Sequence, residues 1–194
     1  MNNPNATDVA ERFNMLAQNE NWRTRIDASM SFAAPALNEM REIWKSVATQ
    51  PGLPSRALFT ARVLKSHLRN LSVMAIEGDA GRPGRYRHRY VGGGMTAVFG
   101  ELTGQTFEDF MPPAILPRTI ACFDAVVEAR GPVRVLTHFQ HHKANYLEAE
   151  IFAAPLAEDG TTPNMVMTVT AFAQVRDSLA PIWQPESTGY LHVS

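Results

Sequence analysis

The chain has 194 residues, of which 45% are hydrophobic, and a formal net charge of −1. This apolar content supports a buried core and argues against a wholly disordered chain. The length suits one domain, or one domain with an extension. Nearly balanced acids and bases argue against a nucleic-acid-binding protein with a broad basic surface, although Arg85, Arg87 and Arg89 make a local basic stripe.

The cellular setting is predicted from cysteine usage and hydropathy. Cys122 is the single cysteine, so no intramolecular disulfide can form, which is typical of a reducing compartment. The polar start of the chain lacks the basic and apolar regions of a secretory signal. No stretch approaches about 18 consecutive apolar residues, so we expect no membrane-spanning helix. The expectation is a cytoplasmic protein with neither nucleic acid nor membrane as partner.

The first part of the chain is predicted to be helical. Thr7 or Asp8 can cap a helix over residues 7–20, and residues 21–30 could continue it. A second helix is predicted over residues 36–48, with a short one within residues 55–69. The second helix carries an apolar stripe that we expect to pack on the sheet or to pair with a second copy. The stripe consists of Leu37, Met40, Ile43, Trp44 and Val47.

From residue 71 the apolar period becomes strand-like. Residues 71–76 and 85–91 indicate two strands of a hairpin. Tyr86, His88 and Tyr90 are expected on one face of the second strand, and its arginines on the other, where Glu148 and Glu150 could pair with them. Helical turns at 95–99 and 107–111 precede a longer helix over 116–129. Strands over 133–139, 145–154 and 165–174 complete the domain.

This order predicts an α+β fold, with a five-stranded antiparallel sheet, short helices on one face and an N-terminal helical extension. We assign residues 1–52 to the extension, for docking or dimerisation. Residues 53–176 form the sheet domain, and residues 177–194 form a C-terminal tail.

The segment from Tyr90 to Phe107 resembles the equivalent part of PAS domains. It has a strand, glycines, a short helix, Phe99-Gly100 and a Leu-Thr-Gly turn in which Gly104 would take a positive φ. More narrowly, the chain resembles the stand-alone PAS proteins of alphaproteobacteria, through Trp44, the Leu-Pro-Ser-Arg segment at 53–56 and the arginine- and tyrosine-rich strand. The resemblance covers roughly residues 40–176. It implies a sensory, signalling or scaffolding role, and no enzymatic activity.

A mostly apolar pocket between sheet and helices is the candidate ligand site, with a plain packed core as the alternative. Its ligand would be a small hydrophobic molecule with Tyr86 or His88 as polar handle. The candidate lining residues are Tyr86, His88, Tyr90, Met95, Phe99, Phe107, Phe110, Phe123 and Val126.

The identity of any cofactor stays open. The covalent flavin sensors of the PAS class carry an Asn-Cys-Arg motif, but residues 106–110 contain no cysteine, and Cys122 is typical of a core residue. A haem would require His88 or His138 as axial ligand, since the helix at 116–129 has no histidine. His138, His141 and His142 cluster near a turn without completing a metal-ligand set, so no metal site is predicted.

The leading interpretation is a PAS sensory protein in which ligand or partner binding changes how the N-terminal helices dock. Output would pass through a homodimer or a separate signalling protein such as a kinase. One alternative is a ligand-free PAS adaptor or scaffold. Another is a small-molecule enzyme with His88 or His138 as base, which a His–carboxylate pair opening into a cavity would indicate.

Overall fold

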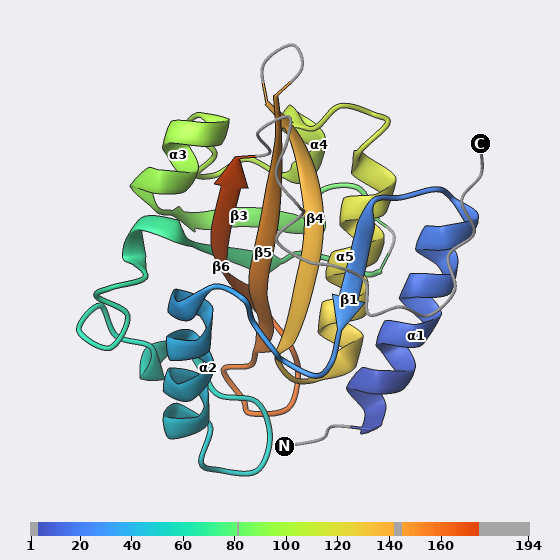
Figure 1. Ribbon diagram of the computed structural model, residues 1–194. Coiled ribbons are helices and arrows are strands. Elements are labelled where there is room, and N and C mark those ends of the chain that lie inside the picture. The colour runs from blue at the N-terminus through green and yellow to red at the C-terminus, as the bar shows by residue number, and fades with distance from the viewer. Residues whose placement is uncertain (1–3, 81, 142–144, 175–194) are drawn as a thin grey trace.

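The computed structural model describes residues 4–80, 82–141 and 145–174 (Figure 1). The proposed tail at 177–194 lies outside these residues. In chain order the elements are α1 (Pro4–Asn19), β1 (Thr24–Asp27), α2 (Pro35–Val47), the 3-10 helices η1 (Arg56–Leu58) and η2 (Leu68–Asn70), β2 (Leu71–Ile76), β3 (Tyr86–Val91), α3 (Gly93–Phe99), α4 (Phe107–Phe110), α5 (Leu116–Ala129), β4 (Val133–His141), β5 (Asn145–Leu156) and β6 (Met165–Gln174).

The strands form one antiparallel sheet in the order β1-β4-β5-β6-β2-β3. The α+β class and all five predicted strands are confirmed, but the predicted strand count is wrong because β1 adds a sixth. Residues 24–27 are too few to show a period. Tertiary contacts fix them instead: Ile26 pairs with Val135, and the Asn14 side chain binds both backbone polar groups of Ile26, at 2.8 and 2.9 Å.

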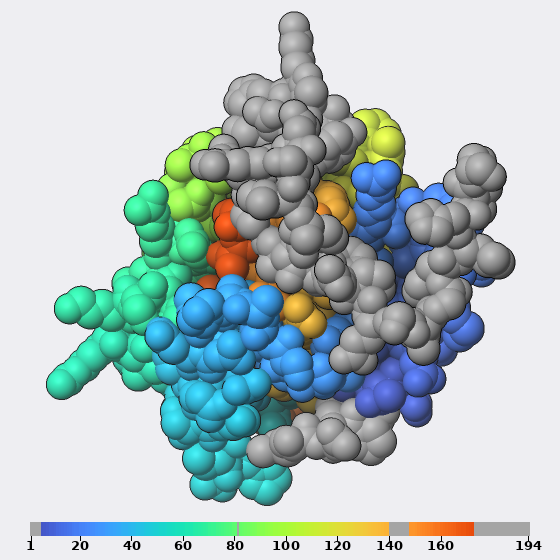
Figure 2. Space-filling view, in the orientation of Figure 1, coloured from blue at the N-terminus to red at the C-terminus, as the bar shows by residue number. Residues whose placement is uncertain are grey.

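The helices α3 to α5 follow the prediction of short helices on one face, and α2 of the predicted extension covers the other face, so two cores lie on opposite sides of the sheet. On one face, α1 and α5 pack against the sheet around Phe13, Val126 and Val135. On the other face, α2 packs against β2, β5 and β6 around Leu37 and Phe152. Figure 1 shows α2 on the near side of the strands and α5 behind them, and Figure 2 shows α2 on the near face.

The apolar stripe of α2 packs on the sheet of its own chain. Leu37 and Met40 are fully buried, and the Trp44 ring lies 5.5 Å from Phe59 and 5.8 Å from Phe152, centroid to centroid. Ile43 and Val47 are partly buried against the same cluster. In this conformation most of the apolar area of the stripe is therefore buried against the sheet of the same chain.

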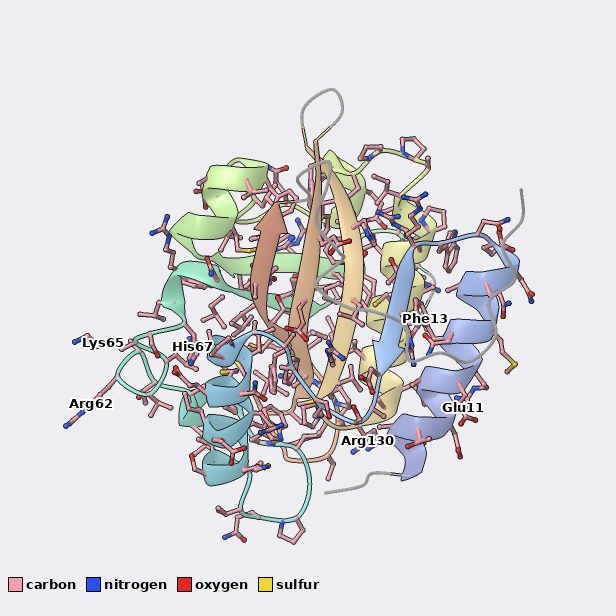
Figure 3. All side chains as sticks on the ribbon, in the orientation of Figure 1. Glu11, Phe13, Arg62, Lys65, His67 and Arg130 are labelled. Carbon is pink, nitrogen blue, oxygen red and sulfur yellow. The ribbon has the colours of Figure 1, made fainter. Side chains whose placement is uncertain are left out.

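Residues 55–69 were predicted to hold a short helix, and they contain η1, the turns after it and the start of η2, which ends at Asn70. Phe59 and Leu64 are fully buried beneath α2, and His67 is buried with them. Arg62 and Lys65 extend away from the body of the molecule (Figure 3). This irregular segment covers the core beneath α2 because a few of its apolar side chains point inward. These side chains do not follow a helical period.

A buried charge network holds the start of α2 to the sheet. Glu150, on β5, is 1% exposed and accepts hydrogen bonds from the backbone N–H groups of Ala33 and Ala34, at 2.9 and 2.8 Å. Arg134 on β4 bridges Glu150 at 2.5 Å and Asp27 of β1 at 3.1 Å. One carboxylate thus joins β4, β5 and the segment that leads into α2.

Candidate functional site

A cavity of about 540 Å³ lies between the sheet and the segment from α3 to α5. This volume is typical of pockets that hold drug-sized ligands. Strands β2, β3, β4, β5 and β6 form one wall, and the helices with their connections form the other. The lining residues are Ser72, Met74, His88, Val91, Met95, Val98, Phe99, Leu102, Phe107, Phe110, Met111, Pro112, Ile115, Thr119, Phe123, Phe139, Ile151, Thr168 and Thr170.

Tight local geometry places α3 and the following turn over the cavity. A Cβ atom at Gly92 would collide with the carbonyl oxygen of Leu68, so glycine lets β3 pass η2 closely before α3 begins. Gly104 has the predicted positive φ, 84°, and its N–H binds the carbonyl of His88 at 2.8 Å. The Leu-Thr-Gly turn is therefore fixed directly to the backbone of the strand that carries His88.

His88 is the polar group that distinguishes this cavity from a packed core. It is 6% exposed, and its ring contacts Phe107 and Phe110, with both centroid distances 5.7 Å. Neither ring nitrogen has a hydrogen-bond partner within the described part of the chain. Burial lowers the pKa of His88 to about 4, so the imidazole is neutral at physiological pH. Buried polar atoms without partners are uncommon in native structures and call for an explanation.

The structure brings most of the predicted pocket residues together. His88, Met95, Phe99, Phe107, Phe110 and Phe123 line the cavity. Val126 lines a smaller neighbouring cavity of about 50 Å³, and Tyr86 packs beside the main one, 5.5 Å from Phe107 and 5.4 Å from Phe123. Tyr90 lies outside: it is 36% exposed, and its hydroxyl donates to the carbonyl of Leu68 at 3.1 Å.

A β-bulge explains why Tyr90 faces away. Val73 pairs with Tyr90 and Met74 pairs with His88, so Arg89 is an extra residue on β3. The extra residue moves every later side chain to the opposite face. Strict alternation predicted Tyr90 beside His88, whereas Val91 occupies the inward position after the bulge.

Tyr86 belongs to a polar cluster behind the cavity wall rather than serving as its handle. Its hydroxyl donates to Asp124 on α5 at 2.5 Å, and Arg85 bridges the same carboxylate at 2.9 Å. Burial, followed by the hydrogen bond to Asp124, raises the pKa of Tyr86 well above its usual value. The cluster fixes β3 to α5.

The sequence left open a pairing of the arginine stripe with Glu148 and Glu150, and the ion pairs in the structure are different ones. Arg87 and Arg89 both bridge Glu77, at 2.8 and 2.7 Å. Glu77 follows β2, the direct partner of β3, so Arg87 and Arg89 share one local carboxylate at the sheet edge. The two glutamates lie on β5, three strands away from β3 in the sheet. Their partners there are Arg134 and His138 on β4.

Sequence reasoning missed the hydroxyl groups on the sheet wall. Ser72, Thr168 and Thr170 line the cavity and are 2–6% exposed. Ser72 and Thr168 are cross-strand neighbours on β2 and β6. A signal was available, since three hydroxyl residues occupy one face of strands whose other face is apolar, through Leu71, Met167 and Val169.

The smaller cavity contains the cysteine. Cys122 is buried, and burial raises its pKa to about 12, so the thiol stays protonated. Arg118 also lines this cavity and donates to the carbonyl of His138 at 2.9 Å. Cys122 therefore has the environment of an unreactive core thiol.

The remaining candidate histidines lie elsewhere. His138 contacts Glu148 at 3.2 Å, but neither residue lines either cavity. The His141 side chain and His142 lie outside what the structure describes. Within the described ranges, no group of three or more potential metal ligands gathers. None of the helices described is both long and apolar enough to span a membrane.

Comparisons with solved structures find light-oxygen-voltage (LOV) domains. One, studied with a flavin analogue, has 15% identity and a TM-score of 0.43, and the match covers 60% of this chain and 87% of the other. The LOV protein of Rhodobacter sphaeroides has 7% identity and a TM-score of 0.40, with 70% and 66% covered. An RNA-binding LOV receptor has 8% identity and a TM-score of 0.39, with 59% and 33% covered.

A search of curated proteins finds no match. The family model for the PAS domain matches residues 32–170, well over half of the sequence. The match includes α2, the cavity wall and the last strand as far as Thr170. This chain belongs to the PAS domain family.

Proposed function

We propose that this chain is a sensory PAS protein that binds a small ligand in the 540 Å³ cavity and relays binding through protein–protein contacts. The observation that carries the proposal is His88, buried in an apolar cavity with both ring nitrogens unpartnered among the described residues. An unsatisfied buried polar group costs about 1–3 kcal/mol. A ligand that hydrogen-bonds to His88 would remove this cost, so the cavity is better suited to a ligand than to being a packed core.

The sheet offers a route for the relay. Along β2, Ser72 and Met74 line the cavity, while Leu71 and Val73 pack toward α2. Likewise on β6, Thr168 faces the cavity and Met167 faces α2. A ligand that shifts these strands therefore acts on the surface that holds α2, which supports a population shift in the docking of that helix.

The other interpretations have less support. PAS domains are in general sensory rather than enzymatic. The enzyme alternative needs a His–carboxylate pair opening into a cavity, whereas the carboxylate partner of His138 lies outside both cavity linings. The adaptor alternative needs no cavity, and it becomes an outcome of the experiments below.

Native mass spectrometry of the purified full chain, compared with the denatured spectrum, is the first test. A mass excess present only in the native spectrum supports a retained ligand, and its value narrows the ligand's identity. A visible absorption spectrum of the same sample distinguishes a haem or flavin from a colourless molecule. If the two masses are equal, the test passes to an added probe.

The probe is N-phenyl-1-naphthylamine, a neutral fluorescent molecule, read through ¹³C-labelled methionine methyl groups. Met74, Met95 and Met111 line the cavity, so their methyl signals should shift on titration. Met15 on α1 is 58% exposed and serves as a control that should not move. Shifts at Met40 and Met167, on the α2 side, would report the relay. Unchanged cavity methionines at saturating probe would overturn ligand binding in favour of the adaptor.

A further inference from the structure

Among the residues that the structure describes, none with a charged side chain lines the main cavity. Its nineteen residues are apolar, hydroxyl-bearing or the neutral His88. Moving an ion from water into such a surface without a partner costs far more than moving a neutral polar group. The cavity therefore selects against anions and cations.

Apart from the hydroxyl of Thr119 on α5, which donates to the carbonyl of Ile115 at 3.2 Å, the polar side chains of the cavity lie on its sheet wall. His88 is on β3, Ser72 on β2, and Thr168 and Thr170 are on β6, the strand next to β2. A neutral imidazole presents one donor and one acceptor, and each hydroxyl presents both. Apart from Thr119, the opposite wall is aromatic and apolar, with Phe107, Phe110 and Phe123 from α4 and α5. A ligand between the walls would expose one polar edge to the sheet and an apolar ring face to the helices.

We infer that the cavity takes an uncharged, predominantly aromatic molecule whose hydroxyl, carbonyl or amide group hydrogen-bonds to His88. This inference rests on the proposed function and specifies the ligand class of the same site. His88 is the specificity-determining residue, because the ligand group that it binds satisfies a ring nitrogen that has no partner among the described residues. An apolar molecule of the same shape leaves that nitrogen unsatisfied, and a carboxylate loses its hydration without gaining a cation in the main cavity.

Three naphthalenes with different groups at the same ring position test the inference. Neutral 2-naphthol, apolar 2-methylnaphthalene and anionic 2-naphthoate compete with bound N-phenyl-1-naphthylamine at pH 7, and the loss of probe fluorescence gives each affinity. We expect 2-naphthol to bind about fivefold more tightly than 2-methylnaphthalene, the effect of one hydrogen bond. We expect 2-naphthoate to bind at least about tenfold more weakly than 2-naphthol.

Two variants at His88 distinguish the contribution of the hydrogen bond to ligand affinity from the contribution of ligand shape. In His88→Leu, the preference for 2-naphthol over 2-methylnaphthalene should fall to less than about twofold, since the imidazole that bonds to the naphthol hydroxyl is gone. In His88→Gln, which keeps a donor and an acceptor, a preference should persist. The methionine methyl spectrum of each variant verifies that the cavity is intact before the competition is measured.

The outcomes distinguish this inference from the proposed function. If the probe fails to shift Met74, Met95 and Met111, the ligand-binding function itself fails. If the probe binds but 2-naphthol and 2-methylnaphthalene compete equally, or His88→Leu keeps the preference, the assignment of His88 is wrong and the cavity still binds ligands. If 2-naphthoate competes as well as 2-naphthol, the neutral ligand class is wrong, and Arg118 of the smaller cavity becomes the candidate anion partner.

Discussion

The imidazole of His88 meets the ring of Phe107 edge-on, with 5.7 Å between the ring centroids and 71° between the ring planes. Phe107 is 2% exposed, and it also contacts Phe123 edge-on at 4.9 Å. The aromatic contacts position the imidazole without satisfying its nitrogens, because ring edges and faces replace few of the hydrogen bonds that water would provide. The hydrogen-bonding capacity of His88 is thereby held ready for another molecule.

Replacing His88 by leucine should stabilise the ligand-free protein while impairing the site. The substitution removes two buried polar atoms that lack partners and keeps a similar volume, so the free energy of unfolding should rise by about 1–2 kcal/mol. Urea unfolding followed by circular dichroism measures this. A matched control is Thr24→Val, which breaks the buried 2.8 Å hydroxyl pair with Thr137 and should destabilise the protein. A marked loss of stability in His88→Leu would indicate that His88 has a structural partner.

The wild-type protein should lose stability as the pH falls from 6.5 toward 4. The folded pKa of His88 is about 4, below the 6.5 of the unfolded chain, so between these values the unfolded state binds a proton that the folded state does not. Above pH 6.5 the imidazole of His88 is neutral in both the folded and the unfolded state, so its protonation no longer lowers the free energy of unfolding. By pH 4 the advantage of His88→Leu over wild type should have grown by about 3 kcal/mol. Urea titrations of both proteins at matched pH values measure this difference in the free energy of unfolding, and the titration of all other groups cancels between them. A difference that stays constant with pH would contradict a buried, neutral His88.

Glu150→Gln should destabilise the fold by about 3 kcal/mol, because it leaves Arg134 buried with only Asp27 as partner and weakens the anchor of Ala33 and Ala34. Hydrogen exchange should increase first in α2 and β1. The control is Glu42→Gln on the exposed face of α2, where solvent screens the pairs with Arg41 and Lys45 and the substitution should change stability little. Equal effects of the two substitutions would show that the buried network does not anchor α2.

Two cysteine variants test the bulge on β3. A cysteine at Val91 would line the cavity, so N-phenyl-1-naphthylamine should slow its alkylation, whereas the alkylation of a cysteine at Tyr90 should be unaffected. Wild-type protein provides the background, because Cys122 is buried with a raised pKa and should react only after denaturation. Protection at position 90 rather than 91 would mean that β3 lacks the bulge.

Sequence patterns predicted the regular elements well and the irregular ones poorly. The helix at 116–129 and the strand at 165–174 have the predicted bounds, since their period and flanking residues agree. The strand Thr24–Asp27 was missed because its stability comes from contacts outside the strand. Asn14 lies on α1, and β4 is distant in sequence. The family resemblance predicted a pocket between sheet and helices, and the cavity lies there. The position of Tyr90 could not be predicted, since a bulge depends on the register with the neighbouring strand.

The short β1 strand determines how this protein can be shortened. A chain reduced to residues 32–170, the part that matches the PAS family, would lack β1 and Asn14, and the backbone of β4 would become a free sheet edge. Unpaired edges recruit strands from other molecules and lead to aggregation. Light scattering of such a truncated chain should therefore show larger particles than the full chain. The first 31 residues would then be the part of the molecule that keeps copies of the sheet apart.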